Sequence, residues 1–226
     1  MSAIELKNVN HYFGSGSSLV HVLQDINFSA NKGQLVLIIG PSGSGKSTFL
    51  TIAGGLRTAS SGEVSIEGQS INQLSRKQSD QLRLAHIGFV LQSYALVPYL
   101  KVSEQLAFVN RIKPEGNLNA EQLKELFAQL GIEDLVNKYP GQLSGGQRQR
   151  VAIARAVYTN PEVILADEPS AALDSDRVVK IGQLFKELAE QRDKAIVVVT
   201  HDTRLMPFAD KVYEIMDGKM SLQQKL

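Results

Sequence analysis

Short apolar runs alternate along the chain with stretches of helical periodicity. Runs with the length of buried strands occur at residues 35–39, 163–166 and 195–200. The first 39 residues favour strands joined by a hairpin turn at 14–18, and a further strand is expected at 62–68. Helices are predicted at about 46–53, directly after a glycine-rich turn, and at 176–190. Because buried strands alternate with helices, the pattern predicts an α/β fold with a parallel sheet and right-handed crossovers.

The middle of the chain is predicted to be helical. Residues 119–122 and 144–147 have the spacing of capping boxes, and apolar residues at helical spacing follow the first of them. Gly131 is a candidate helix stop, and the second helix is expected to end before Pro161. Residues 93–160 are therefore a candidate inserted helical subdomain.

Composition excludes several classes of protein. Hydrophobic residues make up 43% and charged residues 21% of 226, which excludes a disordered chain. The absence of cysteine excludes disulfides, thiolate zinc sites, iron–sulfur sites and a cysteine nucleophile. A formal net charge of +1 argues against nucleic acid as a partner. We expect neither a signal peptide nor a transmembrane segment, because no apolar run reaches the length of either.

Residues 40–48 match the phosphate-loop pattern G-x-x-x-x-G-K-[ST] between a predicted strand and a predicted helix. Its candidate nucleotide-binding residues are Gly40, Pro41, Ser42, Gly43, Ser44, Gly45, Lys46, Ser47 and Thr48. The glycines allow several N–H groups to point at phosphate oxygens, and the helix N-terminus adds partial positive charge. Lys46 is expected to reach the β- and γ-phosphates, and the Ser47 hydroxyl to bind Mg²⁺.

Two carboxylates, Asp167 and Glu168, follow the apolar run at 163–166. Ligands of open α/β sheets bind at the carboxyl ends of the strands. In phosphate-loop nucleoside triphosphatases an Asp at this place orients the Mg²⁺ shell. Strand alternation places the two acids on different sides, so they need not share a role. Glu168 is the candidate catalytic residue that polarises the attacking water.

Residues 143–147 have the sequence Leu-Ser-Gly-Gly-Gln at the start of a predicted helix. Together with the phosphate loop and the acidic strand end, in this order, they make the chain resemble the nucleotide-binding subunit of an ABC (ATP-binding cassette) transporter from about residue 4 to residue 220. The resemblance implies a phosphate-loop ATPase cassette with a RecA-like core, an antiparallel β subdomain and an inserted α-helical subdomain. Residues 1–226 would form one such domain, with the core and β subdomain at 1–92 and 161–226 and the helical subdomain at 93–160.

The resemblance also implies roles for individual residues. Gln92 resembles the glutamine that senses Mg²⁺ and the γ-phosphate, so Ser47, Gln92 and Asp167 are the expected metal ligands. His201 resembles the switch histidine that contacts the γ-phosphate, and the catalytic set is Glu168, His201, Lys46 and Gln92. Asp174 belongs to a segment that resembles the D-loop, which crosses to the other subunit. The residues expected to contact the ATP of a second copy are Ser144, Gly145, Gly146 and Gln147.

An aromatic side chain is expected to stack on adenine. Counting back from residues 22–23 places Phe13 in the position that the family uses, while Tyr12 stays the alternative. Either side chain could instead pack at the strand end.

The resemblance also implies partners and a location. Two copies would enclose two ATP molecules, and their closure would move two permease subunits at the cytoplasmic face of the cell membrane. The segment 94–104, apolar and aromatic, is expected to receive a coupling helix of the permease, with local packing as the alternative.

The pattern at residues 54–56 and 165–169 is similar to the lipoprotein-releasing and macrolide-exporter branch, and the segments 87–93, 96–102 and 104–106 look closest to the ATPase subunit of haem exporters. Alternatives are export of a lipoprotein, peptide or antibiotic, or a soluble ATPase of iron–sulfur assembly.

Overall fold

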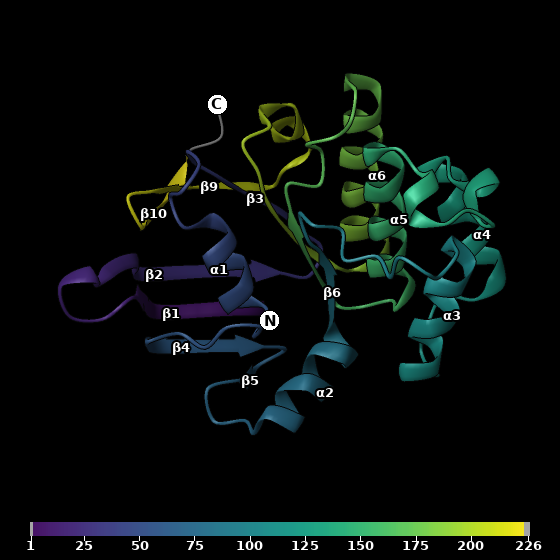
Figure 1. The fold of residues 1–226 in the computed structure, drawn as a ribbon. Coiled ribbons are helices and arrows are strands. Elements are labelled where there is room, and N and C mark those ends of the chain that lie inside the picture. The colour runs from purple at the N-terminus through teal and green to yellow at the C-terminus, as the bar shows by residue number, and fades with distance from the viewer. Residues whose placement is uncertain (1, 224–226) are drawn as a thin grey trace.

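The computed structural model describes residues 2–223 and contains two sheets with helices packed on and beside them (Figure 1). The smaller sheet has four antiparallel strands in the order β2-β1-β4-β5. These strands are β1 (Ser2–Phe13), β2 (Val20–Asn31), β4 (Ser61–Ile66) and β5 (Gln69–Ser70). The connection between β1 and β2 contains a 3-10 turn, η1 (Gly16–Ser18), at the hairpin expected from the sequence. The predicted β-rich start and the antiparallel β subdomain are thus confirmed.

The larger sheet has six strands in the order β10-β9-β3-β8-β7-β6. These are β3 (Leu35–Ile39), β6 (Ile87–Val90), β7 (Val163–Asp167), β8 (Ala195–Val199), β9 (Lys211–Met216) and β10 (Lys219–Gln223). The strands from β9 to β6 are parallel, as predicted, whereas β10 returns antiparallel to β9 in a hairpin that the sequence pattern did not predict. The carboxyl ends of β3, β7 and β8 therefore lie along one edge, where ligands bind in such sheets.

Helices cover both faces of the larger sheet. They are α1 (Lys46–Ala53), α2 (Arg76–His86), α3 (Val102–Ile112), α4 (Ala120–Leu130), α5 (Gly145–Tyr158) and α6 (Ser175–Arg192), with 3-10 turns η2 (Glu133–Leu135), η3 (Pro140–Gln142) and η4 (Thr203–Phe208). In β3, Val36 and Ile38 share a buried cluster with α1 and the smaller sheet. Leu35 and Leu37 point the other way, into the cluster that contains α5 and α6. Helix α1, which follows the phosphate loop, and helix α5 thus lie on opposite faces of the larger sheet.

Local signals explain where the helices of the middle segment begin and end. Capping boxes open α4 at Asn119 and α5 at Ser144, and α4 ends at Gly131 with φ of +59°. A third capping box, at Ser75, opens the unpredicted helix α2. Figure 1 shows α3 and α4 on one side of the molecule, beyond α5. Among residues 2–223, no helix combines the length and the apolar character needed to cross a membrane.

Candidate nucleotide site

The loop between β3 and α1 has a backbone that two glycines make possible. Gly40 has φ of +149°, and a Cβ at that position would lie 2.2 Å from the carbonyl oxygen of Ile215. Gly45 has φ of +105°, and a Cβ there would lie 2.9 Å from the carbonyl oxygen of Val22. Both positions combine a left-handed backbone with close neighbours, so a larger residue would force the loop away from β2 and β9. The sequence therefore winds the chain tightly at the amino end of α1, where phosphate binds in other proteins.

Lys46 and Ser44 line the inside of this loop. Lys46 is buried, and its Nζ donates hydrogen bonds of 2.8 Å to the carbonyl oxygens of Gly40 and Pro41. The Ser44 hydroxyl is also buried, and within the described part of the chain it has no hydrogen-bond partner. An unpaired buried hydroxyl and an ammonium group in the same glycine-rich loop fit a phosphate group. Ser42 and Gly43 lie at the exposed tip of the loop.

Ser47 joins the loop to the acidic strand end. Its Oγ donates to Oδ1 of Asp167 at 3.3 Å. Asp167 is 9% exposed, and this burial raises the pKa of its carboxyl group, while the hydrogen bond from Ser47 opposes the increase. Gln92 is exposed just beyond β6, the strand that pairs with β7, so it lies at the same edge of the sheet. These oxygen atoms are of the kind that Mg²⁺ prefers, and the residues present fit that ion.

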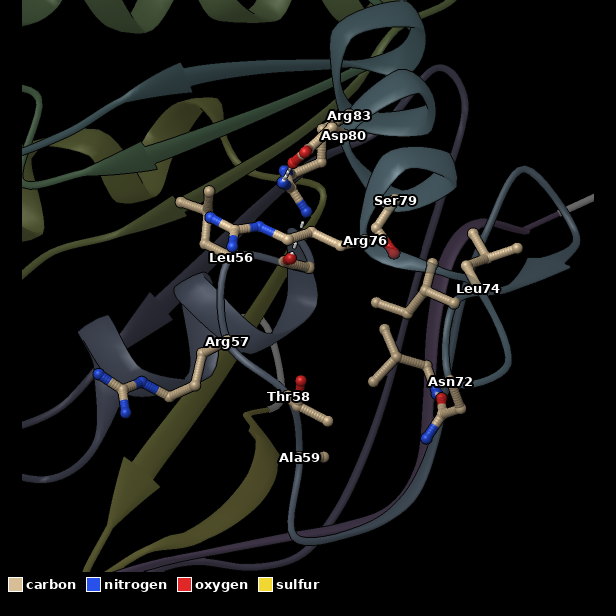
Figure 2. A pocket seen from close by; sticks show the side chains of 13 residues that line it. Leu56, Arg57, Thr58, Ala59, Asn72, Leu74, Arg76, Ser79, Asp80 and Arg83 are labelled. Carbon is tan, nitrogen blue, oxygen red and sulfur yellow. Dashed lines mark hydrogen bonds and ion pairs between the residues drawn. The ribbon is translucent and has the colours of Figure 1, made fainter.

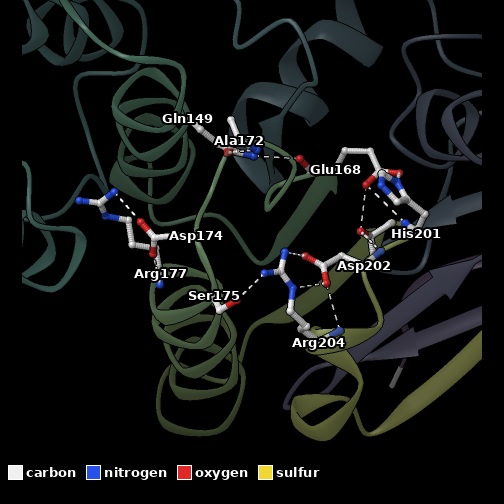
Figure 3. A network of polar contacts seen from close by, with 10 residues as sticks. Gln149, Glu168, Ala172, Asp174, Ser175, Arg177, His201, Asp202 and Arg204 are labelled. Atoms are coloured by element: carbon white, nitrogen blue, oxygen red, sulfur yellow. Dashed lines mark hydrogen bonds and ion pairs between the residues drawn. The ribbon is translucent and has the colours of Figure 1, made fainter.

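Glu168 forms a compact network with the end of β8 (Figure 3). Its carboxylate accepts a 2.9 Å hydrogen bond from Oγ1 of Thr200, and its other oxygen lies 2.8 Å from Nδ1 of His201. The backbone N–H of His201 makes a longer contact of 3.4 Å. Glu168 itself has φ of +50°, and its side chain is 11% exposed, whereas the ring of His201 is 68% exposed. Asp167 and Glu168 thus contact different groups, but strand alternation is not the reason, because β7 ends at Asp167 and Glu168 has a left-handed backbone.

The residues after Leu143 form the start of α5. The Ser144 hydroxyl accepts from the N–H of Gln147 at 3.2 Å, and the Gln147 side chain accepts from the N–H of Ser144 at 2.8 Å. Gly145 and Gly146 lie between them as the first two residues of the helix. Because α5 and α1 cover opposite faces of the sheet, the structure does not place this helix start beside the chain's own phosphate loop.

Asp174 caps the amino end of α6. Its carboxylate accepts from the backbone N–H of Arg177 at 3.0 Å and from the guanidinium of the same residue at 2.7 Å. The side chain is exposed, so the cap lies on the surface (Figure 3).

The two candidate aromatic residues have different neighbours. The ring of Tyr12 stacks on the ring of His21, with centroids 4.1 Å apart and an angle of 16°. The ring of Phe13 has the guanidinium carbon of Arg57 4.7 Å from its centroid. Both aromatic residues are partly exposed, at 40% and 37%. His21 covers one face of Tyr12, and the Arg57 guanidinium lies over the ring of Phe13, so the neighbours alone do not choose between the two.

A cavity of about 410 Å³ lies elsewhere, between the end of α1, the smaller sheet and α2 (Figure 2). Arg83 lines it, but its guanidinium donates to the carbonyl oxygen of Gly55 and pairs with Asp80. The lining contains neither phosphate-loop residues nor the acidic strand end. The nucleotide chemistry therefore belongs to the strand ends and not to this cavity.

Comparison with known proteins agrees with this geometry. Residues 23–171 match the family model described as "ABC transporter". The chain is 43% identical over 226 residues to the "Putative hemin import ATP-binding protein HrtA" of Staphylococcus haemolyticus (strain JCSC1435), covering 97% of this chain and 100% of the relative. The chain belongs to the ABC transporter family. It is an ATPase domain of that family, and such domains bind ATP.

A second relative and two solved structures support the same assignment. The protein of the same name from Staphylococcus aureus (strain MRSA252) is 44% identical, covering 97% of this chain and 99% of the relative. The cassette also superposes on "Dimeric Structure of MJ0796, a Bacterial ABC Transporter Cassette" with a TM-score of 0.91 and 39% identity. Its TM-score to MJ0796 in a dimeric post-hydrolysis state bound to ADP and Pi is 0.89, at 38% identity. Each superposition covers 99% of both chains, which confirms the predicted fold.

Sequence reasoning did not find two residues of this ABC ATPase site. Thr200 donates to the carboxylate of Glu168, and Gln149 of α5 donates to its backbone carbonyl at 2.8 Å. Thr200 directly precedes His201 at a strand end, which is a usable signal. Gln149 has a weaker signal, since it is one of several polar residues in the first two turns of α5.

Proposed function

We propose that this chain is the ATP-hydrolysing subunit of a membrane transporter for haem. Two copies close around two ATP molecules and move two permease subunits. The observation that supports haem as cargo is the identity of 43–44%, over nearly the whole chain, to relatives named as hemin import ATP-binding proteins. The ATPase moves the transporter but need not contact its cargo, so this part of the proposal rests on similarity.

ATP binding is assigned to the phosphate loop. The N–H groups of residues 40–48 and the Ser44 hydroxyl would hold the phosphates, and Lys46 would exchange its two carbonyl contacts for β- and γ-phosphate oxygens. Ser47, Asp167 and Gln92 would hold Mg²⁺, which neutralises charge on the transferred phosphoryl group. Phe13, with Tyr12 as the alternative, would stack on adenine.

Hydrolysis is assigned to Glu168. Its carboxylate would accept a proton or a hydrogen bond from the water that attacks the γ-phosphate. Thr200 and His201 hold the carboxylate in one orientation, at 2.9 and 2.8 Å, and the exposed ring of His201 is free to contact the γ-phosphate. Most of the rate enhancement would come from positioning and from the charge of Lys46.

A second copy would complete each site. Residues 144–147, at the amino end of α5, would contact the ATP held by the other copy, and Asp174 at the start of α6 would lie in the segment that crosses to it. The dimeric MJ0796 structures support this pairing. In this arrangement 93–160 form the helical subdomain, and 1–92 and 161–226 form the catalytic core with the β subdomain.

We place the pair at the cytoplasmic face of the membrane, held there by the permease. Tyr99, 86% exposed, lies in the segment 94–104, and Phe108 of α3 is 48% exposed nearby in sequence. Exposed aromatic side chains of this kind suit a partner helix.

The direction of transport is tested by deleting the gene in its own organism. The resemblance to exporters supports efflux, while the relatives' names state import. Efflux predicts that the deletion strain grows poorly in toxic haem and recovers when the gene is restored, but not when Glu168→Gln is supplied. Normal growth in toxic haem, together with failure to grow on haem as the iron source, would show import. Normal growth in both media would refute haem as the cargo.

A further inference from the structure

A buried glutamine of α5 joins that helix to the backbone of the proposed catalytic residue. Gln149 lies five residues after Ser144 and is 1% exposed. Its Nε2 donates to the carbonyl oxygen of Glu168 at 2.8 Å, and its Oε1 accepts from the N–H of Ala172 at 3.3 Å. Figure 3 shows the side chain reaching from α5 to both ends of this turn. Both the NH₂ group and the oxygen of the Gln149 amide make hydrogen bonds, so Gln149 holds together the two ends of the turn 168–172.

The turn 168–172, which Gln149 holds, begins with a residue in an unfavourable backbone conformation. Glu168 has φ of +50°, a region that residues with a side chain seldom adopt. Its N–H donates to the carbonyl oxygen of Val199 at 2.9 Å, and its carbonyl oxygen also accepts from Ala171 at 3.3 Å. Glu168 is therefore held by β8 on one side and by Gln149 of α5 on the other.

The first turn of α5 also packs directly on the same segment. A Cβ on Gly146 would lie 2.9 Å from the carbonyl oxygen of Ala172 and 3.1 Å from Cδ2 of Leu173. This contact leaves no room for α5 to slide toward residues 172–173 without pushing them. A displacement of the helix start would thus reach Glu168 through both the packing and the Gln149 hydrogen bonds.

We propose that Gln149 is a positioning residue that couples the two ATP sites of the pair. The inference rests on the proposed pairing of two copies. In that pairing, Ser144 and its neighbours contact the ATP of the other copy, whereas Glu168 acts on the ATP bound to its own phosphate loop. Gln149 connects these two places within one chain, so closure of α5 onto one ATP sets the carboxylate that hydrolyses the other.

Two substitutions separate the contacts. Gln149→Met has a similar length and makes neither hydrogen bond. Gln149→Glu keeps an oxygen for the N–H of Ala172 but, in its ionised form, has no donor for the carbonyl of Glu168. Gln183→Met, at an exposed position of α6, is the matched control. For each purified chain we would measure ATP hydrolysis with Mg²⁺ over a range of ATP concentrations, the melting temperature, and ATP affinity by calorimetry.

The wild-type chain is expected to hydrolyse ATP with a Hill coefficient of about 1.5–2, since two sites set the upper limit. Gln149→Met and Gln149→Glu should lower the Hill coefficient toward 1 and kcat by about 10- to 100-fold, since a displacement of about 1 Å can cost about 100-fold. ATP affinity of the single chain and the behaviour of Gln183→Met should stay at wild-type values. If Gln149→Met melts below the assay temperature, Gln149→Glu provides the same comparison.

Three results would overturn the coupling: a wild-type Hill coefficient of 1, Gln149 variants with the wild-type Hill coefficient and kcat, or a loss of kcat at an unchanged Hill coefficient. A failure of the proposed function would look different. In that case the wild-type chain would not hydrolyse ATP, or the Glu168→Gln variant would not form a dimer when ATP is present.

Discussion

The sharpest test of the proposed site is Glu168→Gln. The change removes a negative charge and the ability to accept a proton, yet it keeps the shape of the side chain. The amide oxygen can still accept from Oγ1 of Thr200, and the NH₂ group can face Nδ1 of His201, which lies 2.8 Å from the present carboxylate. The contacts that hold the turn are therefore largely preserved.

The expected loss of rate follows from the role assigned to Glu168. A positioned general base contributes about 10²–10⁴ to the rate, so kcat should fall at least 100-fold, equivalent to about 2.7 kcal/mol or more. The effect on folding should be small, because one neutral hydrogen bond is worth about 1 kcal/mol. For a chain of this size such a change shifts the melting temperature by about 2–4 °C. Activity and stability should thus separate clearly.

The assay is phosphate release with Mg²⁺ and saturating ATP, followed by size-exclusion chromatography in the same buffer. The variant should bind ATP and elute as a dimer that persists, because closure no longer ends in hydrolysis. Glu187→Gln, at an exposed position of α6, controls for the loss of one charge. A kcat for Glu168→Gln within tenfold of wild type would refute the role of Glu168.

Three further predictions concern neighbouring groups. Lys46→Ala should weaken ATP binding at least tenfold by calorimetry, since the β- and γ-phosphates lose their ammonium contact; wild-type affinity would contradict this. Phe13→Ala should weaken ATP binding about tenfold and Tyr12→Ala much less, because stacking on a base is worth about 1–3 kcal/mol; the reverse order would select Tyr12. Burial raises the pKa of Asp167, so its ionised form opposes folding and its stabilising protonated form is lost as pH rises through the folded pKa. Asp167→Asn should therefore melt higher than wild type at pH 8 without nucleotide, with a gap that closes as pH falls through the folded pKa toward 3.8, the ordinary aspartate pKa; an equal gap at pH 8 and below pH 3.8 would contradict the burial effect.

The helices found from the sequence are those with strong local signals. The predicted helix at 46–53 coincides with α1, because a glycine-rich turn fixes its start and apolar residues fill one side. Capping boxes located α4 and α5 to the residue. In these segments the local preference and the tertiary structure agree, which is why the sequence pattern is sufficient.

The missed elements have few buried residues. Helix α2 has the local signal of a capping box at Ser75, but it is polar and buries one residue, Leu82, so no apolar pattern follows that signal. Strand β9 buries two of its six residues, and its pairing with β3, which joins Ile38 to Tyr213, cannot be seen locally.

The same distinction applies to the site. The phosphate loop and the pair Asp167–Glu168 are contiguous motifs, and the strand-end position explains their chemistry. Thr200 and Gln149 contact Glu168 from positions 32 and 19 residues away, so the fold is needed to show these contacts, although the place of Thr200 beside His201 is a local signal. The sequence therefore indicates which carboxylate is the candidate for the chemistry but not what holds it in place.

What holds Glu168 explains why the strained backbone is useful. A glycine would adopt φ of +50° more easily, but it would have no carboxylate, and a residue with a side chain pays about 1–2 kcal/mol for the left-handed region. Val199 at the N–H, Gln149 at the carbonyl, and Thr200 at the carboxylate together outweigh that strain. At about 1 kcal/mol each, the two contacts that remain without Gln149 only just match that strain, so loosening the contact from α5 weakens the hold on the turn while β8 stays in place. Under the proposed function, Glu168 held in this way responds to the position of α5, which is the property that a motor driven by ATP-dependent closure requires.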